Sequence, residues 1–263
     1  MSDSKLRVVP CLKDNYSYVL RERNETECIV VDACEFDPIH KALREDNLDP
    51  QVLLLTHSHH DHIGGLDMLK ATYPKLKVYA HTSLLPALNA VDFGVEDFQS
   101  FELKSFEIQS IHTPCHTMAD VSFYLKLKHS SEAGFLFSGD TLFIAGCGRF
   151  FEGDGDDMWS SLKKIKTLPL DTQVYCGHEY TKSNLNFAAS LEPQNQAIAR
   201  QIENIDRLID QGKPTVPSSL KTELETNPFL RWDQKELLEK NPMLVGQTGG
   251  EILSTLREMK NNF

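Results

Sequence analysis

The sequence lacks any long apolar run. No stretch approaches the roughly 20 apolar residues that a membrane-spanning helix needs. No early segment combines the basic flank and apolar centre of a secretory signal peptide. We therefore expect a cytoplasmic protein with no membrane partner.

Basic residues are also in the minority. The 263 residues include 27 Lys and Arg against 38 Asp and Glu, a formal net charge of −11 at pH 7. Since proteins bind a nucleic-acid backbone through an excess of basic side chains, this balance argues against a nucleic-acid partner. The hydrophobic content of 40% is ordinary for a globular chain that buries one large core or two smaller ones.

Paired cysteine motifs are missing as well. The six cysteines are Cys11, Cys28, Cys34, Cys115, Cys147 and Cys176. They are scattered, and none forms a CxxC pair. Without a secretory signal, this pattern indicates reduced thiols rather than a disulfide framework.

The most informative stretch is Thr56–Gly65, which reads THSHHDHIGG. The aliphatic run Val52–Leu55 before it predicts a buried strand, and the pattern of Leu66–Tyr73 after it predicts a helix. The histidines should therefore lie on the loop between strand and helix, where α/β folds often place their sites. Imidazoles and carboxylates bind zinc, iron and manganese, so this loop predicts a metal site.

The spacing within the loop suits two ions. His57 and His59 are two residues apart and can turn towards one ion, whereas the neighbours Asp61 and His62 suit a second. Each ion needs further ligands, and three loops downstream offer His116, Asp140 and His178.

A bridging carboxylate would offset the repulsion between two cations, and Asp140 is our candidate bridge. Two cations roughly 3.5–4 Å apart would hold a hydroxide between them and lower its pKa to about 7. Such a hydroxide is a hydrolytic nucleophile that requires no catalytic cysteine or serine. Asp32, at the end of an earlier strand, is either an acceptor for a metal-bound imidazole or a helix cap.

Apolar strands that end in polar loops recur along the first two thirds of the chain. We expect strands at Leu6–Pro10, Tyr16–Leu20, Cys28–Asp32, Val52–Leu55, Lys77–Ala80, Ser105–Ile111, Val121–Leu127, Gly134–Phe137 and Gln173–Cys176. Asp37 followed by Pro38 predicts a helix start with Asp37 as N-cap. Loops at one edge of a sheet converge, so four of these loops can form one site.

Beyond Tyr180 the strand pattern stops. Helices are predicted over Asn195–Gln211, Gln234–Leu238 and Ile252–Met259, with a proline-containing loop over Thr215–Arg231. We therefore predict two domains, a mixed-sheet domain over residues 1–178 and a helical domain over residues 179–263.

Several segments resemble a known family. THSHHDH at Thr56–His62 matches the THxHxDH signature of the metallo-β-lactamase superfamily. Six further segments resemble glyoxalase II, the hydroxyacylglutathione hydrolases. They are His112–Thr117 (HTPCHT), Gly139–Phe143 (GDTLF), Gly146–Phe150 (GCGRF), Cys176–Tyr180 (CGHEY), Asn227–Arg231 (NPFLR) and Arg257–Lys260 (REMK). The resemblance covers nearly the whole chain, in order.

The resemblance implies an α/β (α+β) fold, the metallo-β-lactamase αββα sandwich followed by a C-terminal α-helical domain. It makes the first domain, residues 1–178, catalytic and the helical domain, residues 179–263, substrate-binding. It assigns His57, His59 and His116 to a first metal. It assigns Asp61, His62 and His178 to a second, with Asp140 bridging. The cofactors implied are two divalent ions, with zinc favoured and iron or manganese as alternatives. Asp61 and Asp140, with the metal-bridging hydroxide, are the implied catalytic groups.

The implied reaction is hydrolysis of S-D-lactoylglutathione to glutathione and D-lactate, the second step of methylglyoxal detoxification. Other S-2-hydroxyacylglutathiones are implied substrates too. The implied substrate contacts are Arg149, Phe151, Tyr180, Arg257 and Lys260. Two of them depart from the usual family pattern: Arg149 stands where lysine is common, and Phe151 lacks the hydroxyl of a tyrosine.

Four alternatives remain beside this hypothesis. A mono-iron persulfide dioxygenase shares the fold but needs fewer ligands. A trypanothione-dependent thioesterase would need a site that tolerates a cationic polyamine, whereas Arg257 and Lys260 suit a carboxylate. A nuclease would want a basic surface, and a non-catalytic metal protein would need closed coordination shells. We expect a monomer whose partner is a small glutathione thioester.

Overall fold

The computed structural model describes residues 4–263, which form two compact units. The first unit takes in the chain up to His112 and returns for Ala119–Gly139. The second contains Thr113–Met118 and Asp140–Phe263. The predicted domain boundary after residue 178 divides the chain by position in the sequence, whereas these units group residues by contacts in space. The boundary therefore stays a prediction.

A mixed six-stranded sheet forms the first layer of the first unit. Its strands, in spatial order, are β1 (Ser4–Cys11), β2 (Asn15–Glu22), β3 (Glu27–Val31), β4 (Asp49–Leu54), β5 (Lys77–His81) and β6 (Phe93–Val95). The first three are antiparallel neighbours, and the strands from β3 to β6 run parallel. The parallel strands β3 and β4 end at the same edge, and the segments that follow them carry Asp32 and the histidine loop.

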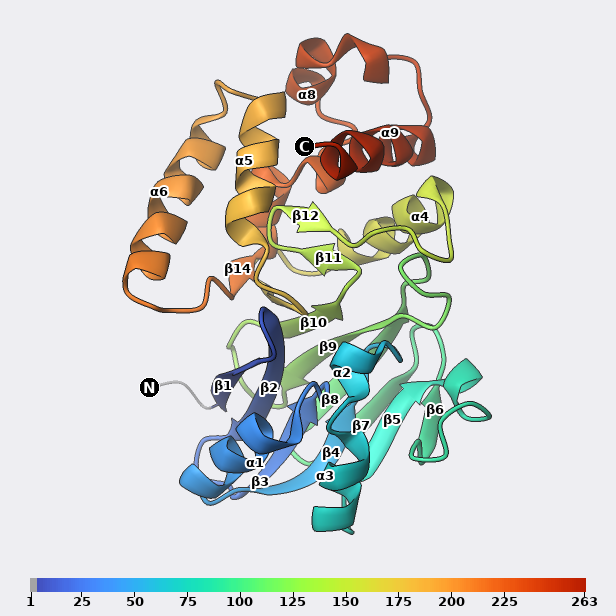
Figure 1. Ribbon diagram of the computed structural model, residues 1–263, viewed down its shortest axis with the longest axis vertical. Coiled ribbons are helices and arrows are strands. Elements are labelled where there is room, and N and C mark those ends of the chain that lie inside the picture. Colours follow the sequence, from blue (N-terminus) through green and yellow to red (C-terminus); the bar gives the residue numbers. More distant parts are fainter. Residues whose placement is uncertain (1–3) are drawn as a thin grey trace. The chain divides into compact units, whose positions relative to one another are not determined.

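Helices cover one face of this sheet. They are α1 (Phe36–Glu45), α2 (His60–Ile63), α3 (Leu66–Thr72) and the 3₁₀ turn η1 (Thr82–Leu84). Alternate residues of the strands, such as Cys28 and Val30 of β3, share a buried cluster with Leu43 of α1 and Leu69 of α3. Figure 1 shows α1 and α3 against this face.

Four antiparallel strands form the second layer of the first unit. They are β7 (Ser100–Leu103), β8 (Phe106–His112), β9 (Val121–Leu127) and β10 (Phe135–Gly139). The ring of Tyr18 in β2 lies 5.2 Å from that of Phe137 in β10, so the two layers touch through aromatic side chains. Both rings are buried.

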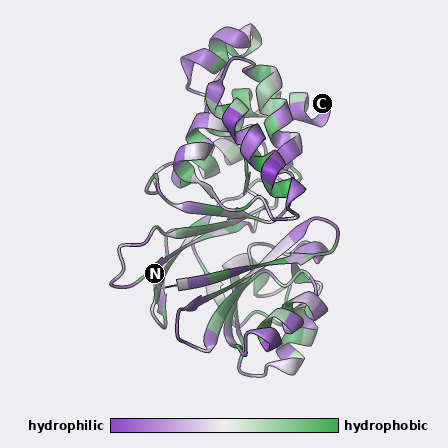
Figure 2. Cartoon of the chain, turned by 90° about the vertical axis from the view of Figure 1, so that its left-hand side faces the viewer, coloured by the Kyte–Doolittle hydropathy of each residue, from purple (hydrophilic) through white to green (hydrophobic). Residues whose placement is uncertain are grey.

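The second unit is mostly helical. Its short strands are β11 (Leu142–Phe143), β12 (Gly146–Cys147), β13 (Gln173–Cys176) and β14 (Ser218–Ser219). Its helices are α4 (Gly155–Ile165), α5 (Thr181–Leu191), α6 (Gln196–Asp210), α7 (Leu220–Thr226), η2 (Pro228–Leu230), α8 (Lys235–Lys240), η3 (Pro242–Leu244) and α9 (Gly249–Asn261). Figure 2 shows hydrophilic and hydrophobic residues alternating along these helices, as expected of amphipathic helices.

Local sequence explains where several of these helices begin. Asp154 and Asp157 form a capping box at α4, and Thr248 and Glu251 form another at α9. Asn195 caps α6 by accepting the backbone N–H groups of the first turn. Between residues 4 and 263, no helix combines the length and apolar character needed to cross a membrane.

The nine predicted strands are all present, with ends shifted by a few residues, but three local predictions are wrong. Asp37 is not a cap, because α1 begins at Phe36 and Asp37 lies in its first turn. Thr215–Arg231 is not a plain loop: it contains α7, whose N-cap Ser219 accepts the N–H of Thr222. The histidine stretch is not entirely loop, since His60–Ile63 forms α2.

Candidate metal centre

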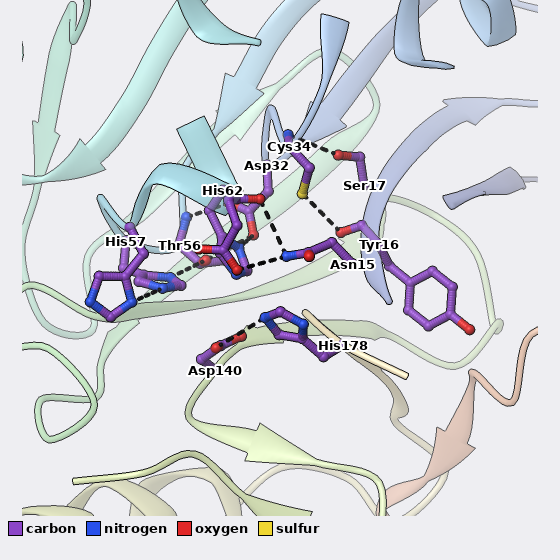
Figure 3. Close-up of polar contacts among 12 residues, drawn as sticks. Asn15, Tyr16, Ser17, Asp32, Cys34, Thr56, His57, His62, Asp140 and His178 are labelled. Carbon is purple, nitrogen blue, oxygen red and sulfur yellow. Dashed lines mark hydrogen bonds and ion pairs between the residues drawn. The ribbon is translucent and has the colours of Figure 1, made fainter. Parts of the chain in front are cut away.

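Asp32 organises the histidine loop of the first unit. It follows β3 in a left-handed conformation with φ of +55° and is almost fully buried. Its carboxylate accepts the N–H of Thr56 at 2.8 Å and the hydroxyl of Thr56 at 2.9 Å. These bonds hold the loop where it leaves β4 (Figure 3).

Asp32 also sets the tautomer of His62. Its Oδ2 lies 2.8 Å from His62 Nδ1, and since a carboxylate only accepts, Nδ1 carries the proton. The lone pair of Nε2 is then available to a metal. Of the two predicted roles for Asp32, the structure supports the acceptor, because Glu35 occupies the N-cap position of α1.

His57 is oriented through the same carboxylate. The Thr56 hydroxyl donates to Asp32, so it accepts the proton on His57 Nδ1, 3.1 Å away. His57 Nε2 then faces His59 Nδ1 at 3.1 Å. Zinc binds imidazole nitrogens at about 2.0–2.1 Å, so two nitrogens on one tetrahedral zinc lie roughly 3.4 Å apart. The pair fits one ion.

Asp61 is held by a residue that the sequence did not single out. Asn15 Nδ2 donates to Asp61 Oδ2 at 3.0 Å and to its carbonyl oxygen at 3.3 Å. Asp61 Oδ2 also lies 3.8 Å from His62 Nε2, so these two donors are adjacent. No local pattern in the sequence linked Asn15 to a residue 46 positions away.

The second unit carries a further donor set. Asp140 Oδ2 lies 3.4 Å from His116 Nε2 and 3.3 Å from His178 Nε2, and all three side chains are buried. These separations exceed the usual range for an N–H···O bond and match those between two atoms bound to one cation. His116 Nδ1 donates to the carbonyl of Arg149 at 3.0 Å, which leaves Nε2 for a metal.

Two glycines allow the close packing around these loops. Gly139 has φ of +49°, and a Cβ there would lie 2.5 Å from Thr56 Oγ1. A Cβ on Gly148 would lie 1.9 Å from the carbonyl oxygen of Asp140. The hydroxyls of Thr113 and Thr141 join the loops of the second unit at 2.9 Å.

All seven predicted ligands therefore belong to organised donor sets. His57, His59, Asp61 and His62 gather in the first unit, and His116, Asp140 and His178 gather in the second. The chemistry of both sets suits divalent metal ions.

Comparison with known proteins identifies the family. Residues 13–178 match the metallo-beta-lactamase superfamily, and residues 179–263 match the hydroxyacylglutathione hydrolase C-terminus. The chain is 38% identical over 259 residues to the cytoplasmic hydroxyacylglutathione hydrolase of Arabidopsis thaliana, covering 98% of this chain and 97% of that protein. The chain belongs to the glyoxalase II family.

Other relatives agree with this placement. The hydroxyacylglutathione hydrolase of Cronobacter sakazakii is 37% identical, with 98% of this chain and 99% of that protein covered. The solved structure of TTHA1623 in a di-iron-bound form has a TM-score of 0.56 and 25% identity, covering 82% of this chain and 95% of that one. The predicted metallo-β-lactamase fold and glyoxalase II family are confirmed.

Three of the residues implied as glyoxalase II substrate contacts line one groove in the second unit. Arg149, Phe151 and Arg257 border a groove of about 370 Å³ together with Ser254 and Glu258. Arg257 is fixed there by a bond from Nη1 to the carbonyl of Cys147 at 2.9 Å.

The other two implied contacts, Tyr180 and Lys260, have different surroundings. The ring of Tyr180 stacks on His178, with centroids 4.9 Å apart and planes 6° from parallel. Lys260 Nζ donates to the carbonyl and the hydroxyl of Ser183, each at 2.8 Å. Burial, and then the charge of Arg257, lowers the pKa of Lys260 to about 8.

Proposed function

We propose that this protein is a hydroxyacylglutathione hydrolase that converts S-D-lactoylglutathione, and other S-2-hydroxyacylglutathiones, to glutathione and the free 2-hydroxy acid. One observation carries the proposal: relatives bearing that name match nearly the entire chain, including the C-terminal segment particular to the family. The coarse class, a thioester hydrolase, follows from the same match.

We propose that the two donor sets together hold two divalent ions. The ligands of the first ion are His57, His59 and His116; those of the second are Asp61, His62 and His178; Asp140 bridges. Zinc is favoured, with iron and manganese as alternatives, because mixed imidazole and carboxylate ligands accept all three. When bound, such ions supply Lewis acidity and a hydrolytic nucleophile at neutral pH.

The residues of the chain prepare this site and bind the substrate. Asp32 and the Arg149 carbonyl hold imidazole protons on Nδ1, so that Nε2 of His62 and His116 can bind metal. Arg149, Tyr180, Arg257 and Lys260 are the proposed glutathione contacts. Phe151 lacks a hydrogen-bond donor, so its proposed role is apolar contact beside His116, whose ring lies 5.0 Å away.

The alternatives are less well supported. A persulfide dioxygenase with a single iron would leave part of the seven-residue donor set without a role. A trypanothione thioesterase would bring a cationic polyamine towards Arg257 and Lys260, which repel it. We further propose that the enzyme acts as a monomer in the cytoplasm.

A direct test combines metal analysis with thioester turnover on one preparation. The wild type is expected to hold two metals and to release thiol from S-D-lactoylglutathione. The Asp140→Ala variant should lose metal and nearly all turnover together, whereas Asp171→Ala, an exposed aspartate of the same unit, should change neither.

Three results would each count against a part of the proposal. A metal-loaded wild type that leaves lactoylglutathione intact would exclude the proposed reaction. An Asp140→Ala variant that keeps two metals and normal turnover would exclude the bridge while leaving the reaction standing. Faster hydrolysis of the trypanothione ester would change the substrate only.

A further inference from the structure

Two buried cysteines of the first unit lie side by side although 23 positions separate them. Cys11 is the last residue of β1, and Cys34 follows β3, next to the segment that orients His62. All six thiols of the chain are free in this structure, including these two. The metal donor sets use neither of them.

Both cysteines contact the hydroxyl of Ser17. Cys11 Sγ lies 3.8 Å from Ser17 Oγ, and the backbone N–H of Cys34 donates to the same oxygen at 3.3 Å. The thiol of Cys34 donates to the carbonyl of Tyr16 at 3.7 Å (Figure 3). Each thiol is also the largest influence on the pKa of the other, so the two sulfur atoms lie close together.

The residues that follow each cysteine are joined as well. The backbone N–H of Leu12 donates to the carboxylate of Glu35. The β1–β2 turn and the segment before α1 therefore lie against each other beyond the sulfur atoms themselves. The two segments are therefore held together at two places, through the side chains of Ser17 and Glu35.

The pKa values of the two thiols are shifted in opposite directions. Hydrogen bonding from Cys34, from Ser17 and from the backbone of Glu35 lowers the pKa of Cys11, against the effect of burial. Its role as donor to Cys11, together with burial, raises the pKa of Cys34. A thiol of lowered pKa beside one of raised pKa is the arrangement of an attacking and a resolving cysteine.

We propose that Cys11 and Cys34 are a reversible modification site that closes to a disulfide on reaction with hydrogen peroxide. The sulfur of Cys11 attacks one peroxide oxygen, the O–O bond breaks, and Cys11 becomes a sulfenic acid as water leaves. The sulfur of Cys34 then attacks Cys11, an S–S bond forms, and a second water leaves. Two thiols are oxidised, one peroxide is reduced, and a dithiol reverses the change.

Access and position suit this role. Leu12, adjacent to Cys11, is 52% exposed, so local opening of the turn admits a molecule as small as peroxide. Ala33, adjacent to Cys34, donates its N–H to the carbonyl of His62 at 2.8 Å and accepts from Gly65 at 2.7 Å. The disulfide therefore tethers the β1–β2 turn to the backbone that supports the ligand loop.

The test uses the full-length protein treated with hydrogen peroxide and read by mass spectrometry. We expect the wild type to lose two hydrogens, to yield a cross-linked pair of peptides containing Cys11 and Cys34, and to recover both thiols after dithiothreitol. Sulfoxide formation at the exposed Met68 serves as the internal control, because it shows that peroxide has reacted with the protein. The readout involves no thioester turnover, so it is independent of the proposed function.

Matched variants separate the pair from the other thiols. Cys28→Ser removes another buried thiol of the same unit, whose pKa burial raises to about 12, and should leave the cross-link intact. Cys34→Ser should stop the reaction at a sulfenic acid on Cys11 that dimedone traps. If Met68 is oxidised while Cys11 and Cys34 of the wild type remain thiols, or if either links to another cysteine instead, the proposal is wrong.

Discussion

Single residues decide the protonation of the candidate ligands. Asp32 accepts directly from His62 Nδ1 and, through the hydroxyl of Thr56, controls His57. One buried carboxylate therefore sets two imidazole tautomers in different parts of the loop. A positive φ at Asp32 brings its side chain to this point, a conformation that aspartate tolerates better than most residues.

Replacing Asp32 tests this arrangement. Asp32→Asn keeps the shape of the side chain but provides a weaker acceptor, so we expect metal affinity to fall by roughly 10–100-fold. Competition with a chromophoric chelator measures the affinity. The control is Asp37→Asn, an exposed acid in the first turn of α1, which should bind metal as the wild type does. Equal affinities in both variants would remove the orienting role.

At the scale of elements, a buried polar network holds the β11–β12 hairpin. Glu223 Oε2 accepts the N–H of Ala145 at 2.7 Å and the amide of Asn227 at 3.1 Å. Asn227 also donates to the carbonyls of Phe143 and Gly146. The hairpin lies between Asp140 and Arg149 along the chain, so this network supports the segment between a candidate ligand and a proposed substrate contact.

Glu223 gives a stability prediction. Burial raises its pKa above the ordinary value of 4.5, so the neutral form is favoured in the folded state. Below pH 4.5, Glu223→Gln should therefore stay close to the wild type. Glu223→Ala leaves the Ala145 N–H unpaired and should cost about 2–4 kcal/mol in urea unfolding.

The sign of the pH effect follows from the raised pKa of Glu223. Its neutral carboxyl contributes fully below the unfolded pKa, and that contribution declines as pH rises from 4.5 towards the folded pKa. Glu223→Gln should therefore gain stability relative to the wild type across this rise. A difference that does not change with pH would contradict the assignment.

Lys260 in helix α9 leads us to expect that KM depends on pH. A pKa of about 8 means that its ammonium loses charge between pH 7 and 9. If it binds a substrate carboxylate, KM for lactoylglutathione should rise over this interval while kcat changes less, because uniform binding is lost. Lys260→Ala should raise KM at pH 7 and remove that part of the pH dependence.

Arg257→Ala serves as the comparison for Lys260. It should raise KM at every pH, since arginine does not titrate in this range. A KM in Lys260→Ala that equals the wild-type value at pH 7 would exclude Lys260 as a contact.

At the scale of the whole molecule, the candidate ligands come from four loops spread over residues 57–178. Ions held by both donor sets would stabilise the folded chain by mass action, because the unfolded chain offers no organised site. We expect a strong chelator to lower the thermal unfolding temperature and abolish turnover, and added zinc to restore both.

The Asp140→Ala variant is the control for the chelator. It should already unfold at the lower temperature and respond little to chelation. If the wild type unfolds at the same temperature with and without chelator, while metal analysis confirms removal, the ions do not link distant parts of the chain.

Local sequence determined much of this protein by itself. Alternating apolar residues predict β9 and β13 with the bounds observed, and the histidine loop predicts the donor types and the superfamily. These features depend on periodicity and residue chemistry within a few positions. The missed helix α4 also carried a local signal, the capping box of Asp154 and Asp157.

Only the tertiary structure decided how those pieces support one another. Asn15 holds Asp61 across 46 positions, Glu223 holds Ala145 across 78, and Cys11 meets Cys34 across 23. Strand register and the path of each turn determine such pairings, and no short-range pattern in the sequence encodes them. Residue types therefore indicate which chemical groups are available. The fold decides which of these side chains come into contact and so act on one another.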